Sequence, residues 1–274
     1  GLVTGVQTCA LPILEKRTYN DINTLTLTMT GEDTEKILKS VNKAYNTEIN
    51  DVLLTALYMG VKEWTGNNAA LITLEGHGRE EINKDINVSR TVGWFASEYP
   101  VMLEASENKD ISYVIKTIKE NIKGIPKRGI GYGGLKYLSE DKYEEFNLKT
   151  IEPEILFNYL GQFDEDMGKE TFKISSLSMG SSVSPHIEMK HVFEIEGAIV
   201  ENKLSIDFKY SINEYNKDTV LKFMECFQRS LTDIIEHCTG KDKTELTPSD
   251  FTYKKLSIEK LDKIKSKLQN IYKG

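Results

Sequence analysis

Two periodicities meet in residues 23–45, Asn-Thr-Leu-Thr-Leu-Thr-Met-Thr-Gly-Glu-Asp-Thr-Glu-Lys-Ile-Leu-Lys-Ser-Val-Asn-Lys-Ala-Tyr. Before Gly31, apolar side chains alternate with threonine, which predicts a half-buried strand over 23–30. After Gly31, acidic residues in a first turn and apolar side chains every three or four positions predict a helix over 32–45. A strand that leads into an amphipathic helix is typical of an α/β layered domain.

The same reasoning extends along the rest of the chain. A second helix is expected from Asn50 to Trp64, and residues 69–74 read as a short buried strand. Further helices are predicted over 111–122, 220–235 and 258–268, further strands over 151–160 and after Pro100, and a hairpin from 192–200 and 203–210. This order predicts an α/β fold with a mixed β-sheet packed by helices.

The composition excludes several classes of protein. Of the residues, 39% are hydrophobic and 28% charged, as in soluble globular proteins. The net charge of −7 argues against nucleic-acid binding, and no apolar run approaches the roughly 20 residues of a membrane span. Cys9, Cys226 and Cys238 are too few for a disulfide framework and form no metal-ligand spacing, so a reduced, cytoplasmic setting is expected.

The chain divides into three segments by composition. Residues 1–13 contain no Asn, Lys or Tyr, although the rest of the chain is rich in them, and are expected to be a non-native segment. Residues 14–240 carry the periodic pattern of one folded unit. Residues 241–274 are expected to form a linker and a short C-terminal helix that leads toward a following domain.

Four short blocks mix glycine with aromatic or ionisable side chains, where a core segment would show plain periodicity. They are Glu75-Gly-His-Gly-Arg-Glu80, Arg90-Thr-Val-Gly-Trp-Phe95, Pro126-Lys-Arg-Gly-Ile-Gly-Tyr-Gly133 and Phe157-Asn-Tyr-Leu-Gly-Gln-Phe-Asp164.

Each block has a chemical and a structural interpretation. At the end of a buried strand, Glu75 could be a desolvated proton acceptor or donor, or it could pair with Arg79 or Arg90. His77, between two glycines, is expected to be a hydrogen-bonding loop residue. Residues 90–95 suit a packed corner with a cation–π contact as well as a ligand wall.

The last two blocks divide in the same way. Residues 126–133 lack the Lys-Ser/Thr ending of a phosphate-binding loop, so we reject nucleotide binding and expect a flexible loop that carries Tyr132 over a cleft. Asn158 and Tyr159 could orient an oxyanion or a ligand amide, or the tyrosine could be a buried residue bonded to backbone. Outside the blocks, Ser181-Ser-Val-Ser-Pro-His186 shows no nucleophile elbow, so serine-hydrolase chemistry is unsupported.

Taken together and in order, the four blocks resemble the later signature motifs of the epimerization domains of non-ribosomal peptide synthetases, within the condensation-domain superfamily. The resemblance covers residues from about 20 to 251, including Ser249-Asp-Phe251, and matches the C-terminal lobe alone. It implies a chloramphenicol acetyltransferase-like lobe, one half of a V-shaped domain with its active site in a tunnel between two lobes.

The resemblance also implies a reaction and its participants. Epimerization domains interconvert L- and D-aminoacyl or peptidyl thioesters by removing and returning the α-proton. The substrate hangs on the phosphopantetheine arm of a partner carrier domain, and no cofactor or metal is bound directly. By position, Glu75 and Tyr159 match the catalytic residues, whereas His77, Trp94, Tyr132 and Asn158 match the substrate-binding surroundings. Adjacent synthetase domains and the missing N-terminal lobe are the expected partners.

One departure from the family pattern changes the activity that we expect of this chain. The family's second acid/base group is a histidine in a His-His-x-x-x-Asp-Gly motif, but the histidines of this chain are His77, His186, His191 and His237, with no adjacent pair. We therefore expect this polypeptide alone to be inactive. Two alternatives remain: a non-catalytic lobe that docks carrier or synthetase domains, and a fragment of a superfamily acyltransferase.

Overall fold

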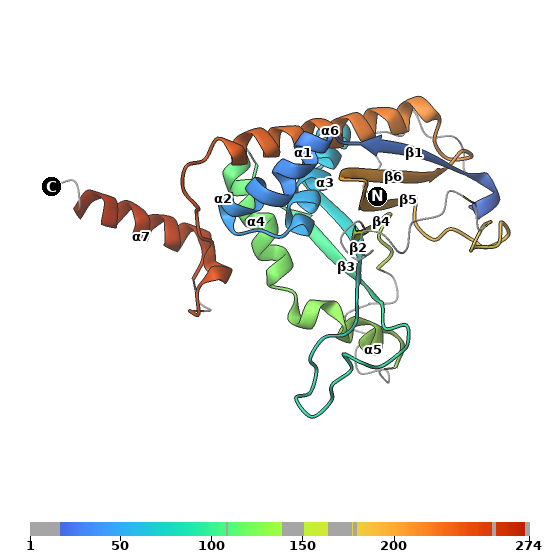
Figure 1. Cartoon of the computed structure of the whole chain (residues 1–274), viewed down its shortest axis with the longest axis horizontal. Coiled ribbons are helices and arrows are strands. Elements are labelled where there is room, and N and C mark those ends of the chain that lie inside the picture. Colours follow the sequence, from blue (N-terminus) through green and yellow to red (C-terminus); the bar gives the residue numbers. More distant parts are fainter. Residues whose placement is uncertain are drawn as a thin grey trace.

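A six-stranded mixed sheet forms the centre of the molecule (Figure 1). The computed structural model describes residues 17–107, 109–138, 151–163, 177, 180–253 and 256–271, so the proposed non-native segment 1–13 and the start of the lobe at 14–16 lie outside it. The strands are β1 (Ile22–Thr28), β2 (Ala69–Gly76), β3 (Ser97–Glu104), β4 (Ile155–Gln162), β5 (Phe193–Val200) and β6 (Lys203–Ser211). Their order is β1-β6-β5-β4-β2-β3, and β4 runs parallel to both of its neighbours. The predicted α/β fold with a mixed sheet is confirmed.

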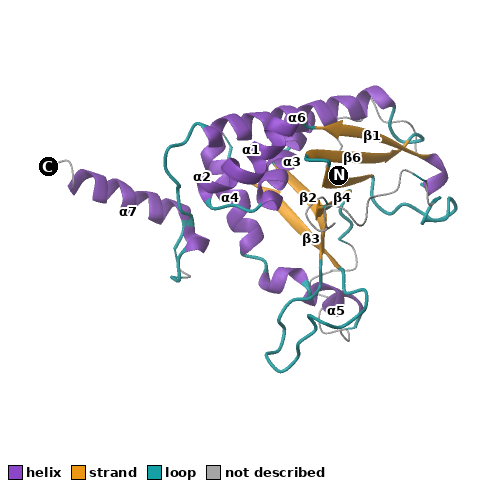
Figure 2. Cartoon of the chain, in the orientation of Figure 1, coloured by secondary structure: helices purple, strands orange, loops and turns teal. Residues whose placement is uncertain are grey.

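Helices cover one face of this sheet (Figure 2). They are α1 (Gly31–Lys36), α2 (Asn42–Tyr45), α3 (Ile49–Thr65), α4 (Ile111–Lys123) and α6 (Lys217–Thr239), while α7 (Ile258–Ile271) follows the linker. The helix predicted over 32–45 is interrupted by a π-helical turn at Ile37–Val41.

The core lies between α3, α6 and the sheet. Gly60 of α3 sits so close to α6 that a Cβ atom there would lie 2.9 Å from the Cα of Phe227. The absence of a side chain at Gly60 therefore allows the two helices to approach closely. Phe193, Phe208 and Phe223 interlock edge to face beneath them, at centroid separations of 5.5 Å from Phe223. Fully burying such a side chain contributes roughly 1.5–3 kcal/mol.

Two expectations about local structure were wrong. Residues 131–137 form α5 (Gly131–Tyr137), although the glycine-dense sequence predicted a loop. Strand β3 starts at Ser97, before Pro100 and not after it. Proline lacks a donor for the ladder, but β3 is an edge strand, where one side of the backbone needs no partner.

A buried ion pair is among the contacts that anchor the C-terminal linker on the lobe. The Nζ of Lys119 lies 2.8 Å from Oδ2 of Asp250, and the Lys119 side chain is only 1% exposed. Asp250 also accepts a hydrogen bond from the backbone N–H of Thr247, and Thr247 is fully buried. In the described part of the chain, we find no helix with the length and apolar character needed to span a membrane.

Candidate active site

Glu75 lies at the end of β2, on the sheet face opposite the helices. Its neighbour Leu74 is buried on the helix side, and alternation along the strand turns Glu75 to the other side. The parallel register places Leu74 opposite Phe157 of β4, so the residues that follow each of them are neighbours too. As a result, Nδ2 of Asn158 donates a hydrogen bond of 2.9 Å to Oε2 of Glu75.

The surroundings of Glu75 favour its protonated form. Burial is the main reason that the pKa of Glu75 is raised, and the negative charges of Glu98 and Glu196 raise it further. Glu98 is the direct cross-strand partner of Glu75 in the antiparallel β2–β3 pair. A carboxyl group with a raised pKa can both take up and release a proton closer to neutral pH, which is what acid/base chemistry requires.

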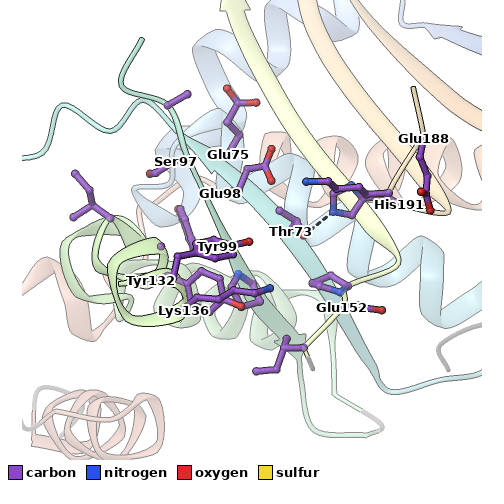
Figure 3. Close-up of a pocket in the computed structure, with 18 of the residues that line it drawn as sticks. Thr73, Glu75, Ser97, Glu98, Tyr99, Tyr132, Lys136, Glu152, Glu188 and His191 are labelled. Carbon is purple, nitrogen blue, oxygen red and sulfur yellow. Dashed lines mark hydrogen bonds between the residues drawn. The ribbon is translucent and has the colours of Figure 1, made fainter. Parts of the chain in front are cut away.

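Glu75 lines two cavities. The larger has a volume of about 850 Å³, and Tyr132 also lines it (Figure 3). Trp94 is another of its lining residues. The smaller has a volume of about 460 Å³ and is lined by His77, Asn158 and Tyr159 as well as by Glu75. Ligand pockets in proteins typically measure roughly 300–1,000 Å³. The fold thus brings all six candidate residues, which come from four separate blocks, to the linings of two cavities that share Glu75 and Tyr99.

Tyr159 faces the helix side of β4, opposite to Asn158. Its ring covers Gly197 of β5, where a Cβ atom would lie 3.5 Å from Cδ2 of the tyrosine. Burial raises the pKa of Tyr159 to about 12, so the hydroxyl keeps its proton at neutral pH and can donate a hydrogen bond. Tyr159 and Glu75 therefore approach the smaller cavity from opposite faces of the sheet.

The first block is held by its own polar side chains and does not neutralise Glu75. His77 accepts a hydrogen bond from the backbone N–H of Arg79 and lies 3.0 Å from Oε1 of Glu80, which makes it the hydrogen-bonding loop residue that we expected. The alternative that Arg79 pairs with Glu75 was wrong, because the Arg79 guanidinium binds backbone carbonyls.

The third block is packed against the first block and β3. Nε of Arg128 lies 3.7 Å from Oε1 of Glu80 in the first block, and Nζ of Lys127 donates to the backbone oxygen of the next residue, Glu81, at 2.7 Å. Gly129 has φ +74°, and the Tyr99 ring fills the space where a Cβ atom would be, with Cγ 2.1 Å away. Only glycine fits this contact. The contact leads the chain into α5, where Tyr132 lines the larger cavity from a helix and not from the expected loop.

Comparison with known proteins places this chain in a family. A model of the condensation-domain family matches residues 7–257. The chain belongs to the condensation-domain family. The resemblance inferred from the four blocks is thereby confirmed at the level of the family.

The chain is also similar to parts of two curated peptide synthases. Gramicidin S synthase 1 of Brevibacillus brevis is 49% identical over 86% of this chain, which corresponds to 22% of that protein. Surfactin synthase subunit 1 of Bacillus subtilis is 43% identical over 88% of this chain and 7% of that protein. The chain therefore spans a small part of these relatives.

A solved structure within the condensation-domain family shares the fold. The crystal structure of the epimerization domain from the third module of tyrocidine synthetase B is 40% identical and superposes with a TM-score of 0.78. The match covers 85% of this chain and 53% of that one, so this chain corresponds to about half of that epimerization domain.

Sequence reasoning missed two residues of this candidate site. Glu98 was assigned to the approach to a strand, so its cross-strand pairing with Glu75 was not anticipated. His191 precedes β5, and its Nε2 lies 3.0 Å from Oγ1 of Thr73, inside the larger cavity (Figure 3). Burial lowers the pKa of His191, so its imidazole is neutral at pH 7. Strand register could have revealed Glu98, whereas no local pattern marks His191.

Proposed function

We propose that this chain supplies one half of the active site of an epimerization domain. The reaction is exchange of the α-proton of an aminoacyl or peptidyl thioester, which interconverts the L and D forms. The observation that carries the proposal is the position of Glu75, a carboxyl group with a raised pKa that lines both cavities and accepts a hydrogen bond from the Asn158 amide.

The chemistry follows from a carboxylate at this position. The carboxylate of Glu75 takes the α-proton, the C–H electron pair moves into the enolate, and the enolate oxygen carries the negative charge. Asn158 fixes the orientation of the carboxylate by its hydrogen bond. The protonated hydroxyl of Tyr159 is suited to donate to the enolate oxygen. A proton then returns to the opposite face of the planar enolate, and the reverse direction uses the same groups in reversed roles.

The second acid/base group belongs to a part of the domain outside this chain. The described residues and the full sequence contain no adjacent histidine pair, and the chain corresponds to about half of the tyrocidine epimerization domain. We propose that the N-terminal half supplies this group and that a carrier domain delivers the thioester on its phosphopantetheine arm. Adjacent synthetase domains are the remaining partners, in a cytoplasmic assembly, which is compatible with the free buried thiols of Cys226 and Cys238.

A hybrid domain tests the proposal. In this hybrid domain, the matching segment of the epimerization domain from the third module of tyrocidine synthetase B is replaced by this chain. Carrier-bound aminoacyl thioester is incubated with the hybrid domain in D₂O, and deuterium at the α-carbon is measured by mass spectrometry. We expect incorporation with the hybrid domain and none with the isolated chain.

The controls distinguish an epimerization lobe from a docking lobe and from an acyltransferase. A folded hybrid domain that incorporates no deuterium, while the unaltered tyrocidine domain does, would contradict the proposal and favour a docking lobe. Incorporation by the isolated chain would show that a second half is not needed. Loss of the acyl group to an added amine or alcohol, without deuterium exchange, would instead identify an acyltransferase.

A further inference from the structure

The connection between β2 and β3, residues 77–96, is organised around a single side chain. Nη1 of Arg79 donates to the backbone oxygens of Val88 and Thr91 at 2.7 and 2.9 Å, and Nη2 donates to that of Gly93 at 3.1 Å. The same guanidinium lies 4.3 Å from the centroid of the Phe95 ring. One side chain thus holds four positions of the segment 88–95.

These contacts replace the backbone pairing that a loop of this length lacks. Carbonyl groups outside helices and sheets need donors of their own, and the planar fork of arginine presents several N–H groups at fixed angles. The start and end of the connection also touch directly. Gly78 has φ +64°, and a Cβ atom there would lie 1.5 Å from the backbone oxygen of Phe95. The loop therefore closes on its own first residues.

Trp94 lies between two of the positions that Arg79 contacts. Its side chain is 89% exposed and lines the larger cavity, so it is not held by burial in the core. The carbonyl of Gly93 before it and the ring of Phe95 after it are both bound by Arg79. We propose that Arg79 is a positioning residue that places Trp94 at the mouth of the larger cavity. The consequence for substrate rests on the proposed function, but the effect on the loop does not.

Limited proteolysis of the chain itself tests the structural half. Arg79→Lys keeps the charge and every trypsin site, but an ammonium group cannot reach three carbonyls and stack on a ring at once. Losing charge-assisted hydrogen bonds should raise the open population of the loop, so we expect cleavage between Arg90 and Thr91 to accelerate about tenfold or more. Arg229→Lys is the matched control, because Arg229 pairs with Glu63 on the surface between α3 and α6.

The outcome is judged on the site of cleavage. Acceleration confined to residues 84–95, with the unfolding midpoint unchanged, supports the proposal. An unchanged rate at Arg90 overturns it. If Arg79→Lys also weakens the whole fold, the rate of cleavage within α6 measures that general effect. Equal acceleration within α6 and after Arg90 overturns the proposal as well.

Kinetics of the hybrid domain test the link to Trp94. We expect Arg79→Lys to raise KM for the carrier-bound thioester more than it lowers kcat, and Trp94→Ala to do the same. If Arg79 acts through Trp94, the double variant is no worse than Trp94→Ala, whereas additive losses overturn this role. A hybrid domain without any exchange would count against the proposed function, and the proteolysis result would still decide the structural role of Arg79.

Discussion

At the scale of single residues, the charged form of Glu75 lowers the stability of the fold. The raised pKa of Glu75 means that the folded protein binds the carboxyl proton more tightly than the unfolded chain does. Glutamates in the unfolded chain have a pKa of about 4.3. Above both pKa values the charged carboxylate therefore lowers stability, and this loss disappears as the pH falls below the unfolded value. Such a cost at one residue is typical of a site selected for chemistry.

Glu98 is the residue that tests this electrostatic account. Because it is the cross-strand neighbour of Glu75, Glu98→Gln removes a like charge and should lower the pKa of Glu75. The measurement is an NMR titration of the Glu75 side-chain carboxyl carbon in the isolated chain, which needs no activity. We expect the midpoint to move to lower pH.

Glu104→Gln is the matched control for this titration. Glu104 lies on the same strand but at the opposite end, where it pairs with Ala69. This substitution should leave the Glu75 midpoint where it is. An unmoved midpoint in Glu98→Gln, or equal movement in both variants, would show that Glu98 does not act on Glu75.

At the scale of elements, close packing of α3 on α6 holds the lobe together. Gly60→Ala would bring a methyl group within 3.0 Å of the Phe227 backbone, which cannot yield as a flexible side chain can. Overpacking of this kind costs about 1–3 kcal/mol, so we expect the free energy of unfolding to fall by that amount in urea denaturation. A gain in stability would contradict the close helix contact.

Gly134→Ala provides the opposite case in α5. A Cβ atom there meets nothing within 4 Å, so the substitution adds helix propensity without a clash. We expect it to stabilise α5 by about 0.5–1 kcal/mol. Slower hydrogen exchange of residues 131–137 would show this effect, and faster exchange would mean that these residues do not form a helix.

The elements also show how far local sequence can predict this fold. Strand β1 and helices α3, α4 and α6 were predicted because their periodicity is long and matches their burial. Helix α5 was missed because Gly131, Gly133 and Gly134 carry a low intrinsic preference that the structure overrides. The start of β3 was missed because the edge position that tolerates Pro100 depends on sheet order, which no local pattern contains.

The sequence predicted the candidate site in part as well. The four blocks identified Glu75, Asn158 and Tyr159 as candidates. Their arrangement, with Asn158 bonded to Glu75 and Tyr159 on the opposite face of β4, follows from the register between β2 and β4. Many residues separate β2 from β4 in the sequence, so the contact between Glu75 and Asn158 forms only when the chain folds.

At the scale of the whole molecule, the linker is tied to the lobe by Lys119 and Asp250. Lys119→Met would leave the Asp250 carboxylate, 8% exposed, without its cation. Breaking a buried pair from one side costs about 3–5 kcal/mol, and we expect this loss in chemical denaturation together with release of residues 245–251 to proteolysis. Lys39→Met, which removes a pair on the exposed surface with Glu35, should change the free energy of unfolding far less, because water and salt screen an exposed pair. Equal losses in the two variants would contradict the anchoring role.

The proposal that Glu75 takes up the α-proton applies to the lobe joined to an N-terminal half, and Glu75→Gln in the hybrid domain tests it most directly. Gln can still accept the hydrogen bond from Asn158, so the fold and the cavity should be retained, but it cannot take up the α-proton. The measurement is deuterium incorporation from D₂O, starting separately from the L- and the D-aminoacyl thioester. We predict that interconversion is lost and that exchange is abolished or confined to one enantiomer. Unchanged exchange from both enantiomers would remove Glu75 from the reaction and contradict the account.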